Sequence, residues 1–271
     1  MVENKMIRTE IIKSIDRIME IVSEQNYSSK IGRYRSSNLY RGLPNADYTL
    51  ITSLQRNCRD KQEEIESSIL RNFTKYAVIE NPKITDSVWT KLTIGQHHGL
   101  PTRLLDWTYS PLIGLHFATS GEDLKYMDQH DCVLWKIDIE ELNSLLPIKY
   151  RSVLSAEKAY LFTIDMLVKL VDDLGKYDTD MDDKSMVLLE PPSIDQRIIN
   201  QYSYFSVIPM KVRCVESFFN NNTSNTVKYV IDKNLRWEIR DMLDRMNINE
   251  RTIYPGLDGI STWLKRHYYV K

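Results

Sequence analysis

The sequence is poor in the residues that build disulfide frameworks and zinc sites. Only three cysteines occur among its 271 residues, Cys58, Cys132 and Cys214, and no two of them form a Cys-x-x-Cys pair. An odd, widely spaced set of this kind excludes a zinc ribbon and a disulfide-stapled secreted fold. We therefore expect a reducing compartment.

Long apolar runs and a strong net charge are also missing. No stretch of about 18 apolar residues occurs, and charges are spread through segment 1–10, so we expect neither a membrane span nor a secretory signal. The 36 Lys and Arg side chains nearly balance the 37 Asp and Glu side chains. This balance removes the overall positive field that attracts nucleic acid or an anionic membrane surface. These absences predict a soluble, cytoplasmic protein.

The composition that remains is typical of a globular protein with a sizeable core. Hydrophobic residues make up 42% of the chain and charged residues 27%. Strands and helices are mixed without the regular alternation of a doubly wound fold, and no repeat or low-complexity linker divides the chain. We therefore expect one α+β domain.

Hydrophobic periodicity predicts where helices and strands lie. Helical spacing occurs at 6–22, 65–77, 88–94, 111–118, 197–201, 235–246 and 263–269. Strands are expected at 38–42, 132–139, 186–189, 204–208 and 227–231. Segment 150–184 is expected to be a helix followed by an exposed acidic loop at 178–183. We interpret Gln96–Ser110, which contains Gly99 and Pro101, as an irregular ligand-facing loop, with a rigid structural turn as the equal alternative.

Several blocks of sequence resemble one family. Leu39-Tyr40-Arg41-Gly42, followed by 50–56, is similar to the opening motif of the FRG-domain family, with Tyr40 in place of the phenylalanine in the family's name. Gln96–Pro111 with Phe117-Ala118 is similar to its longest motif. Weaker blocks lie at 197–205, where Tyr204 stands in place of a glycine of many relatives, and at 253–259. The resemblance implies an FRG domain over 38–271, preceded by a helix and lead-in at 1–37.

The layout is also similar to that of mono-ADP-ribosyltransferases of the arginine-serine-glutamate type. This second resemblance implies an ADP-ribosyltransferase-like sheet core with flanking helices. It makes Arg41 the first catalytic position, Thr108 the second, with Ser110 beside it, and Gln201 the third. A carboxylate normally stands at the third position, so Asp195 and Glu190 are the alternatives to Gln201.

A wider set of residues is expected to bind the cofactor. The guanidinium of Arg41 can reach a phosphate, and Gly42 leaves the backbone uncrowded; a structural ion pair is the alternative for Arg41. Arg103 and Asp106 are candidates for a buried ion pair that holds the loop, and Trp107 for a stacking face or a core residue. The full expected set is Tyr40, Arg41, Gly42, His97, His98, Thr102, Arg103, Asp106, Trp107 and Ser110.

No metal is expected. His97 and His98 are adjacent, so their side chains diverge, and no third His or Cys lies at helical spacing to complete a zinc site. A nuclease is excluded by the lack of clustered acidic metal ligands.

These residues favour a domain that uses NAD as a substrate. It would transfer ADP-ribose to an unidentified acceptor, a protein or a nucleic acid, or hydrolyse NAD. The resemblance implies a toxin or phage-defence effector in a bacterial cell. The alternative is a non-catalytic nucleotide- or protein-binding module. The hypothesis expects Arg41, Thr108 and Gln201 to converge on one cleft, and Arg41 to gain its partner only when a phosphate binds.

Overall fold

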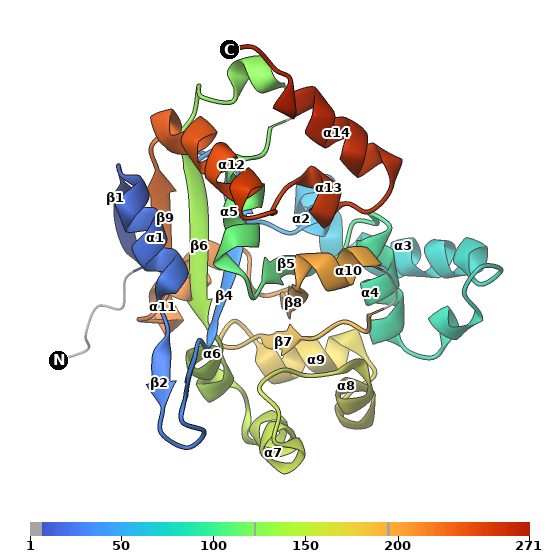
Figure 1. Ribbon diagram of the computed structural model, residues 1–271. Helices are drawn as coiled ribbons and strands as arrows, with labels where there is room; N and C mark the ends of the chain where they lie inside the picture. The colour runs from blue at the N-terminus through green and yellow to red at the C-terminus, as the bar shows by residue number, and fades with distance from the viewer. Residues whose placement is uncertain (1–6, 122, 194–195) are drawn as a thin grey trace.

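A computed structural model describes residues 7–121, 123–193 and 196–271. Its centre is a seven-stranded sheet with the order β1-β9-β6-β4-β5-β8-β7, in which only β1 and β9 run parallel (Figure 1). The strands are β1 Arg8–Ile12, β4 Asn38–Leu43, β5 Leu104–Thr108, β6 Cys132–Asp138, β7 Val187–Leu189, β8 Ser203–Val207 and β9 Val227–Ile231. A separate hairpin is formed by β2 Asn26–Ser28 and β3 Arg33–Arg35.

Helices surround the sheet on both faces and at both ends. They are α1 Ile15–Ser23, α2 Ser53–Cys58, α3 Gln62–Ala77, α4 Val88–His97, α5 Pro111–Thr119, α6 Ile139–Leu145, α7 Ile148–Glu157, α8 Ile164–Leu170, α9 Leu174–Met181, α10 Gln196–Gln201, α11 Val215–Asn222, α12 Arg236–Arg245, α13 Glu250–Ile253 and α14 Leu257–His267. The expected α+β domain with one mixed sheet and flanking helices is confirmed. No helix within the described residues is long and apolar enough to span a membrane.

Strand β6 shows how the sheet is covered. Its side chains alternate, as the pleat of a strand requires. Cys132 and Leu134 pack in a core with residues of α1, α5 and α12, whereas Val133 and Trp135 pack in a second core with residues of α11. All seven β6 positions but the last are buried. The strand therefore reads as a continuous apolar run, which explains why it was predictable.

A third core lies under the far half of the sheet. Residues of β5, β7 and β8 pack there against α3, α4 and the helices α7 to α9, which form the lower part of Figure 1. Trp89 and Tyr177 meet edge to face at the centre of this core, with ring centroids 5.3 Å apart.

The two halves of the sheet are joined weakly. Strands β4 and β6 share six residue pairs, but β4 and β5 share a single pair, Tyr40 with Thr108. Beyond this pair the facing edges of β4 and β5 have no further ladder pairs within the described chain. We refer to this place as the β4–β5 split, and it positions the candidate site.

Three sequence predictions were wrong at the level of elements. The helix expected at 6–22 is the strand β1 followed by α1, because Arg8–Ile12 adds to the open edge of β9 and Ser14 then caps a new helix through the backbone N–H of Arg17. Met6 lies outside the described residues. The loop expected at Gln96–Ser110 contains the end of α4 and all of β5. The acidic loop expected at 178–183 begins inside α9.

Candidate functional site

Glycine at the end of β4 is required by the packing of α5. A Cβ atom on Gly42 would lie 2.1 Å from the carbonyl oxygen of Gly114 and 2.2 Å from the backbone nitrogen of Ala118. Gly114 in turn leaves room for Tyr40, because a Cβ atom added to Gly114 would lie 3.1 Å from the Cβ atom of Tyr40. The backbone of α5 therefore rests directly on β4. This face of Gly42 is filled by the helix, which corrects the expectation that the glycine leaves the backbone open to a phosphate.

Arg41 starts on the opposite face of β4 from Tyr40 and Gly42 and reaches into the β4–β5 split. Its Nη1 donates to the main-chain oxygen of Asp106 at 2.7 Å and lies 3.5 Å from the Oδ2 atom of the same residue. Its Nε is buried and has no partner among the described residues. Burial lowers the pKa of Arg41 while the Asp106 carboxylate opposes this effect, and a guanidinium stays charged throughout. Arg41 thus has a protein partner without any ligand, contrary to expectation.

Asp106 presents a carboxylate beside Arg41. About half of its side chain is exposed, 53%, although its neighbours along β5 are buried. Oδ2 accepts from Nε2 of Gln96 at 2.8 Å, and Oε1 of Gln96 accepts from the buried hydroxyl of Thr102. We call Arg41, Asp106, Gln96 and Thr102 the Arg41 network. The hydrogen bonds fix the orientation of the Asp106 carboxylate toward Arg41.

Thr108, the last residue of β5, is in contact with Gln201, the last residue of α10. The hydroxyl of Thr108 donates to the main-chain oxygen of Gln201 at 2.8 Å. Thr108 is buried, and its oxygen also accepts from the backbone N–H of Ser110 at 3.2 Å. Nε2 of Gln201 is buried and has no partner among the described residues. Because Thr108 pairs with Tyr40, next to Arg41, the structure brings the three expected catalytic residues to adjoining positions, although Arg41 leaves β4 on the other face.

Three residues expected to bind the cofactor have structural contacts instead. Tyr40 is fully buried under α5, and Ser110 is the N-cap of α5, accepting from the backbone N–H of Ile113. Trp107 is buried and donates from Nε1 to Ser206 at 2.9 Å. Tyr40 and Trp107 are thus buried in the core, and the Ser110 oxygen serves as the cap of α5.

The ion pair expected between Arg103 and Asp106 does not form. Arg103 is buried and forms a two-pronged pair with Glu66 of α3 and a 2.7 Å contact with Asp178 of α9. Side chains three positions apart on an extended chain point to opposite faces, so Arg103 and Asp106 do not pair with each other. Burial lowers the pKa of Arg103, but the hydrogen bonds and charges of Glu66 and Asp178 outweigh this effect. The pKa of Arg103 is therefore raised. Arg103 joins α3 and α9 to the sheet.

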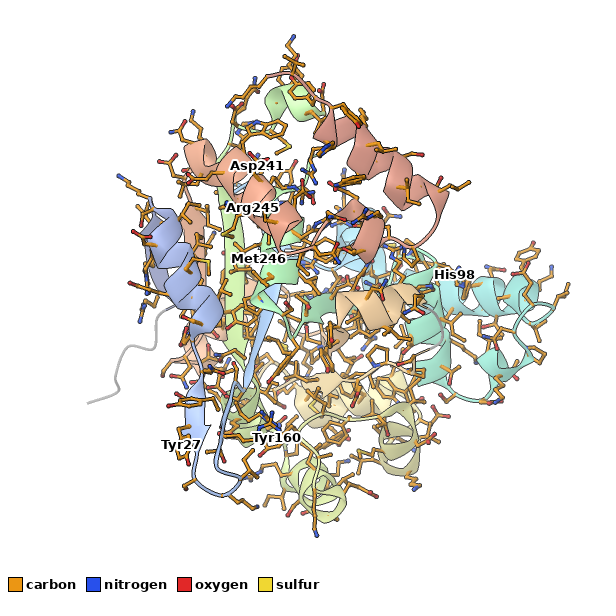
Figure 2. All side chains as sticks on the ribbon, in the orientation of Figure 1. Tyr27, His98, Tyr160, Asp241, Arg245 and Met246 are labelled. Atoms are coloured by element: carbon orange, nitrogen blue, oxygen red, sulfur yellow. The ribbon has the colours of Figure 1, made fainter. Side chains whose placement is uncertain are left out.

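His97 and His98 end α4 and line a cavity of about 630 Å³. Their rings are 5.2 Å apart and nearly perpendicular. Figure 2 shows His98 at the end of α4 nearest α13 and α14. Across the cavity, the guanidinium of Arg197 lies 5.3 Å over the ring of Tyr254. Arg197 belongs to α10, the helix that ends at Gln201.

The alternatives for the third catalytic position lie elsewhere. Glu190 follows β7 and lines a different cavity with Thr163 and Pro191. Asp195 lies outside the described residues. No group of three His, Cys, Asp or Glu side chains within the described part of the chain is arranged to hold a metal ion.

Sequence reasoning missed four residues that shape this region: Gln96, Glu66, Asp178 and Arg197. Gln96 and Arg197 stand inside the blocks that resemble the FRG family, which was the available signal for them. Glu66 and Asp178 lie in charged stretches that give no sign of burial. Their partner Arg103 is distant in sequence from both.

The comparisons with known proteins bear on the first half of this site. No curated protein and no solved structure matches the chain. The FRG-domain family model matches residues 36–126. The matched segment contains the whole Arg41 network, Thr108 and α5, and it ends before Gln201. Through these residues, segment 36–126 is identified as an FRG domain.

Proposed function

We propose that this protein binds NAD, or a closely related nucleotide, beside the β4–β5 split and cleaves the bond between the ribose and nicotinamide. The observation that carries the proposal is the pairing of Arg41 with a half-exposed carboxylate in a break of the sheet. The unpartnered Nε of Arg41 leaves donor capacity for a phosphate oxygen. The acceptor of ADP-ribose is a protein or nucleic acid, or water if NAD is hydrolysed.

We assign to Asp106 the role of the carboxylate that normally stands at the third catalytic position, where this chain has Gln201. Cleavage of the glycosidic bond develops positive charge on the ribose, which a nearby carboxylate stabilises. Gln201 lacks that charge, and Glu190 lines a separate cavity. The carboxylate of Asp106 is oriented by Gln96 and Arg41. In the proposed reaction, the bond between the ribose and nicotinamide breaks and nicotinamide leaves with the electron pair. The anomeric carbon of the ribose then forms a bond to the acceptor oxygen or nitrogen, which releases its proton to solvent.

The cavity at His97 and His98 accommodates the rest of the nucleotide. Arg197 stacks on Tyr254 at its wall, and an aromatic face of this kind supports a nucleobase. The proposed biological role, a toxin or phage-defence effector in a bacterial cell, rests on the layout resemblance to ADP-ribosyltransferases alone.

The decisive experiment measures nicotinamide release from NAD by the purified protein. Asp106→Asn is the informative variant, because it keeps the main-chain oxygen that accepts from Arg41 and removes only the carboxylate charge. We expect its rate to fall by at least tenfold, and Arg41→Lys to behave similarly because lysine lacks the planar fork. Asp241→Asn and Arg245→Lys, on α12 (Figure 2), are matched controls at exposed positions and should retain full activity.

A non-catalytic nucleotide- or protein-binding module is the second candidate. It is favoured by one observation: the hydroxyl of Thr108 is already engaged by Gln201 and is buried. Saturable binding of NAD without nicotinamide release would support this module and contradict the enzyme. Full turnover in both Asp106→Asn and Arg41→Lys would remove the Arg41 network from the reaction.

A further inference from the structure

A second cavity, of about 520 Å³, lies between α5, α12, α14 and the chain that follows α5. It shares no residue with the Arg41 network. Pro44, Leu124 and Met127 form apolar parts of its wall, and His116, Arg240 and Lys265 form polar parts. This cavity meets the His97–His98 cavity only at Tyr254 and Thr262.

The hydrogen bond from Arg240 fixes the tautomer of His116. Nη1 of Arg240 lies 3.0 Å from Nδ1 of His116. A guanidinium can only donate, so Nδ1 accepts and the ring hydrogen is on Nε2. That Nε2–H is buried and has no acceptor among the described residues. His116 lines the cavity, and its Nε2–H is therefore an unused donor at this site.

Arg240 provides a second unused donor. Its Nη2 pairs with Glu250, and its Nη1 is shared between the ring and the main-chain oxygen of His116. Its Nε, however, is buried and has no partner within the described chain. Leaving a buried donor unpaired costs about 1–3 kcal/mol, so two at one cavity indicate an acceptor that enters from outside.

The charge around the cavity favours an anion. Three buried arginines, Arg236, Arg240 and Arg266, are close to it. Among the described residues, Glu250 and Asp244 form ion pairs with Arg240 and Arg266. Arg236 donates to main-chain oxygens, including those of Pro44 and Ser120 in the cavity wall. Arg236 forms no ion pair within the described residues, although the charge of Asp128 acts on it, and Lys265, exposed on α14, adds a further positive charge.

We propose that this cavity binds a small organic anion. An oxygen of its carboxylate or phosphate group accepts from Nε2 of His116 and Nε of Arg240, and its apolar part packs against Leu124 and Met127. Burial, followed by the charge of Arg240, lowers the pKa of His116 to about 3, so the ring remains a neutral donor at physiological pH. The site shares Tyr254 and Thr262 with the His97–His98 cavity but no residue with the Arg41 network, so its anion binding does not depend on the proposed NAD reaction.

Calorimetric titration of the full chain with four probes tests this assignment. Phenyl phosphate and benzoate combine an apolar ring with each of the two oxyanions, and the tighter of them identifies the group that the site prefers. We expect one equivalent of that probe to bind. Inorganic phosphate, which lacks the apolar part, should bind at least tenfold more weakly, and benzyl alcohol, which lacks the charge, should not bind.

Two substitutions connect binding to this cavity. Leu124→Trp fills the cavity from its apolar wall without touching the buried charges and should abolish binding. Ile79→Trp, at a position 85% exposed and outside the cavity, should leave it unchanged. In ¹⁵N-labelled protein, the Nε2–H resonance of His116 should shift on binding. Absence of saturable binding for both anions, equal binding of benzyl alcohol, or unchanged binding in Leu124→Trp would overturn the proposal and leave a cavity that holds water only.

Discussion

Among single residues, His116 makes the stability of the protein depend on pH. Its folded-state pKa of about 3 lies below the ordinary value of 6.5, because of burial and then of Arg240, against the opposing charge of Glu250. Between about pH 3 and pH 6.5 the His116 ring is protonated in the unfolded chain and neutral in the folded chain. The stabilisation is therefore complete above pH 6.5 and is lost as the pH falls, at up to about 1.4 kcal/mol per pH unit.

Urea unfolding between pH 7 and pH 4.5 measures this loss. Glu250, whose pKa is lowered to about 2 from 4.5 by Arg266 and Arg240 against its burial, contributes a further loss only below pH 4.5. We expect a falling stability in wild type and a flatter profile in His116→Gln. Should that variant fail to fold, the ring resonances of His116 decide the question: titration near pH 6.5 would contradict the expected protection.

Glu66 should contribute strongly to stability for a different reason. Its replacement in Glu66→Gln leaves Asp178 as the one ion-pair partner of the buried Arg103 guanidinium within the described chain. Removing one member of a buried ion pair typically costs about 3–5 kcal/mol. Urea unfolding should show a loss of this size. Glu64→Gln, an exposed position on α3 whose partner Lys61 is also exposed, should change the free energy of unfolding by less than about 0.5 kcal/mol.

At the scale of elements, the contact of α5 with β4 depends on Gly42. A methyl group there meets backbone atoms at 2.1 Å and 2.2 Å, so Gly42→Ala must displace the whole helix. We expect a loss of about 3 kcal/mol in the free energy of unfolding. Gly175→Ala is a matched control within α9, where the nearest atom is the end of the Asp173 side chain, and it should be neutral or slightly stabilising. A neutral Gly42→Ala would show that α5 is loosely held.

Elements with one clear periodicity were predictable, and elements with two interpretations were not. The buried strand β6 and the capped helix α5 follow directly from their apolar runs and from Ser110-Pro111. The isoleucines before Ser14 fit a helix as well as a strand, and only pairing with β9, far along the chain, decides for the strand. Strand β5 was missed because Gly99 and Pro101 precede it and the half-exposed Asp106 interrupts its apolar pattern.

At the scale of the whole molecule, the sheet is two halves that meet at one residue pair. Each half has its own helices. Arg41 connects β4 to Asp106 of β5, and Arg103 connects the start of β5 to Glu66 of α3. The sequence contained the FRG motifs and hence most of the Arg41 network. It could not show the partners of Arg103 or the cavity at His116, because those depend on which distant charges the fold buries together.

The parallel pairing of β1 with β9 has a consequence for biosynthesis. Arg8 lies beside Val227, so β1 waits for roughly 220 residues to be translated before its partner strand exists. At about 5–20 residues per second, this delay is on the order of ten to forty seconds. Until then β1 has no place in the sheet, and β6 has an unpaired edge of the kind that invites association with other chains. The nascent protein is thus most vulnerable to aggregation between translation of β6 and translation of β9, which ends that exposure.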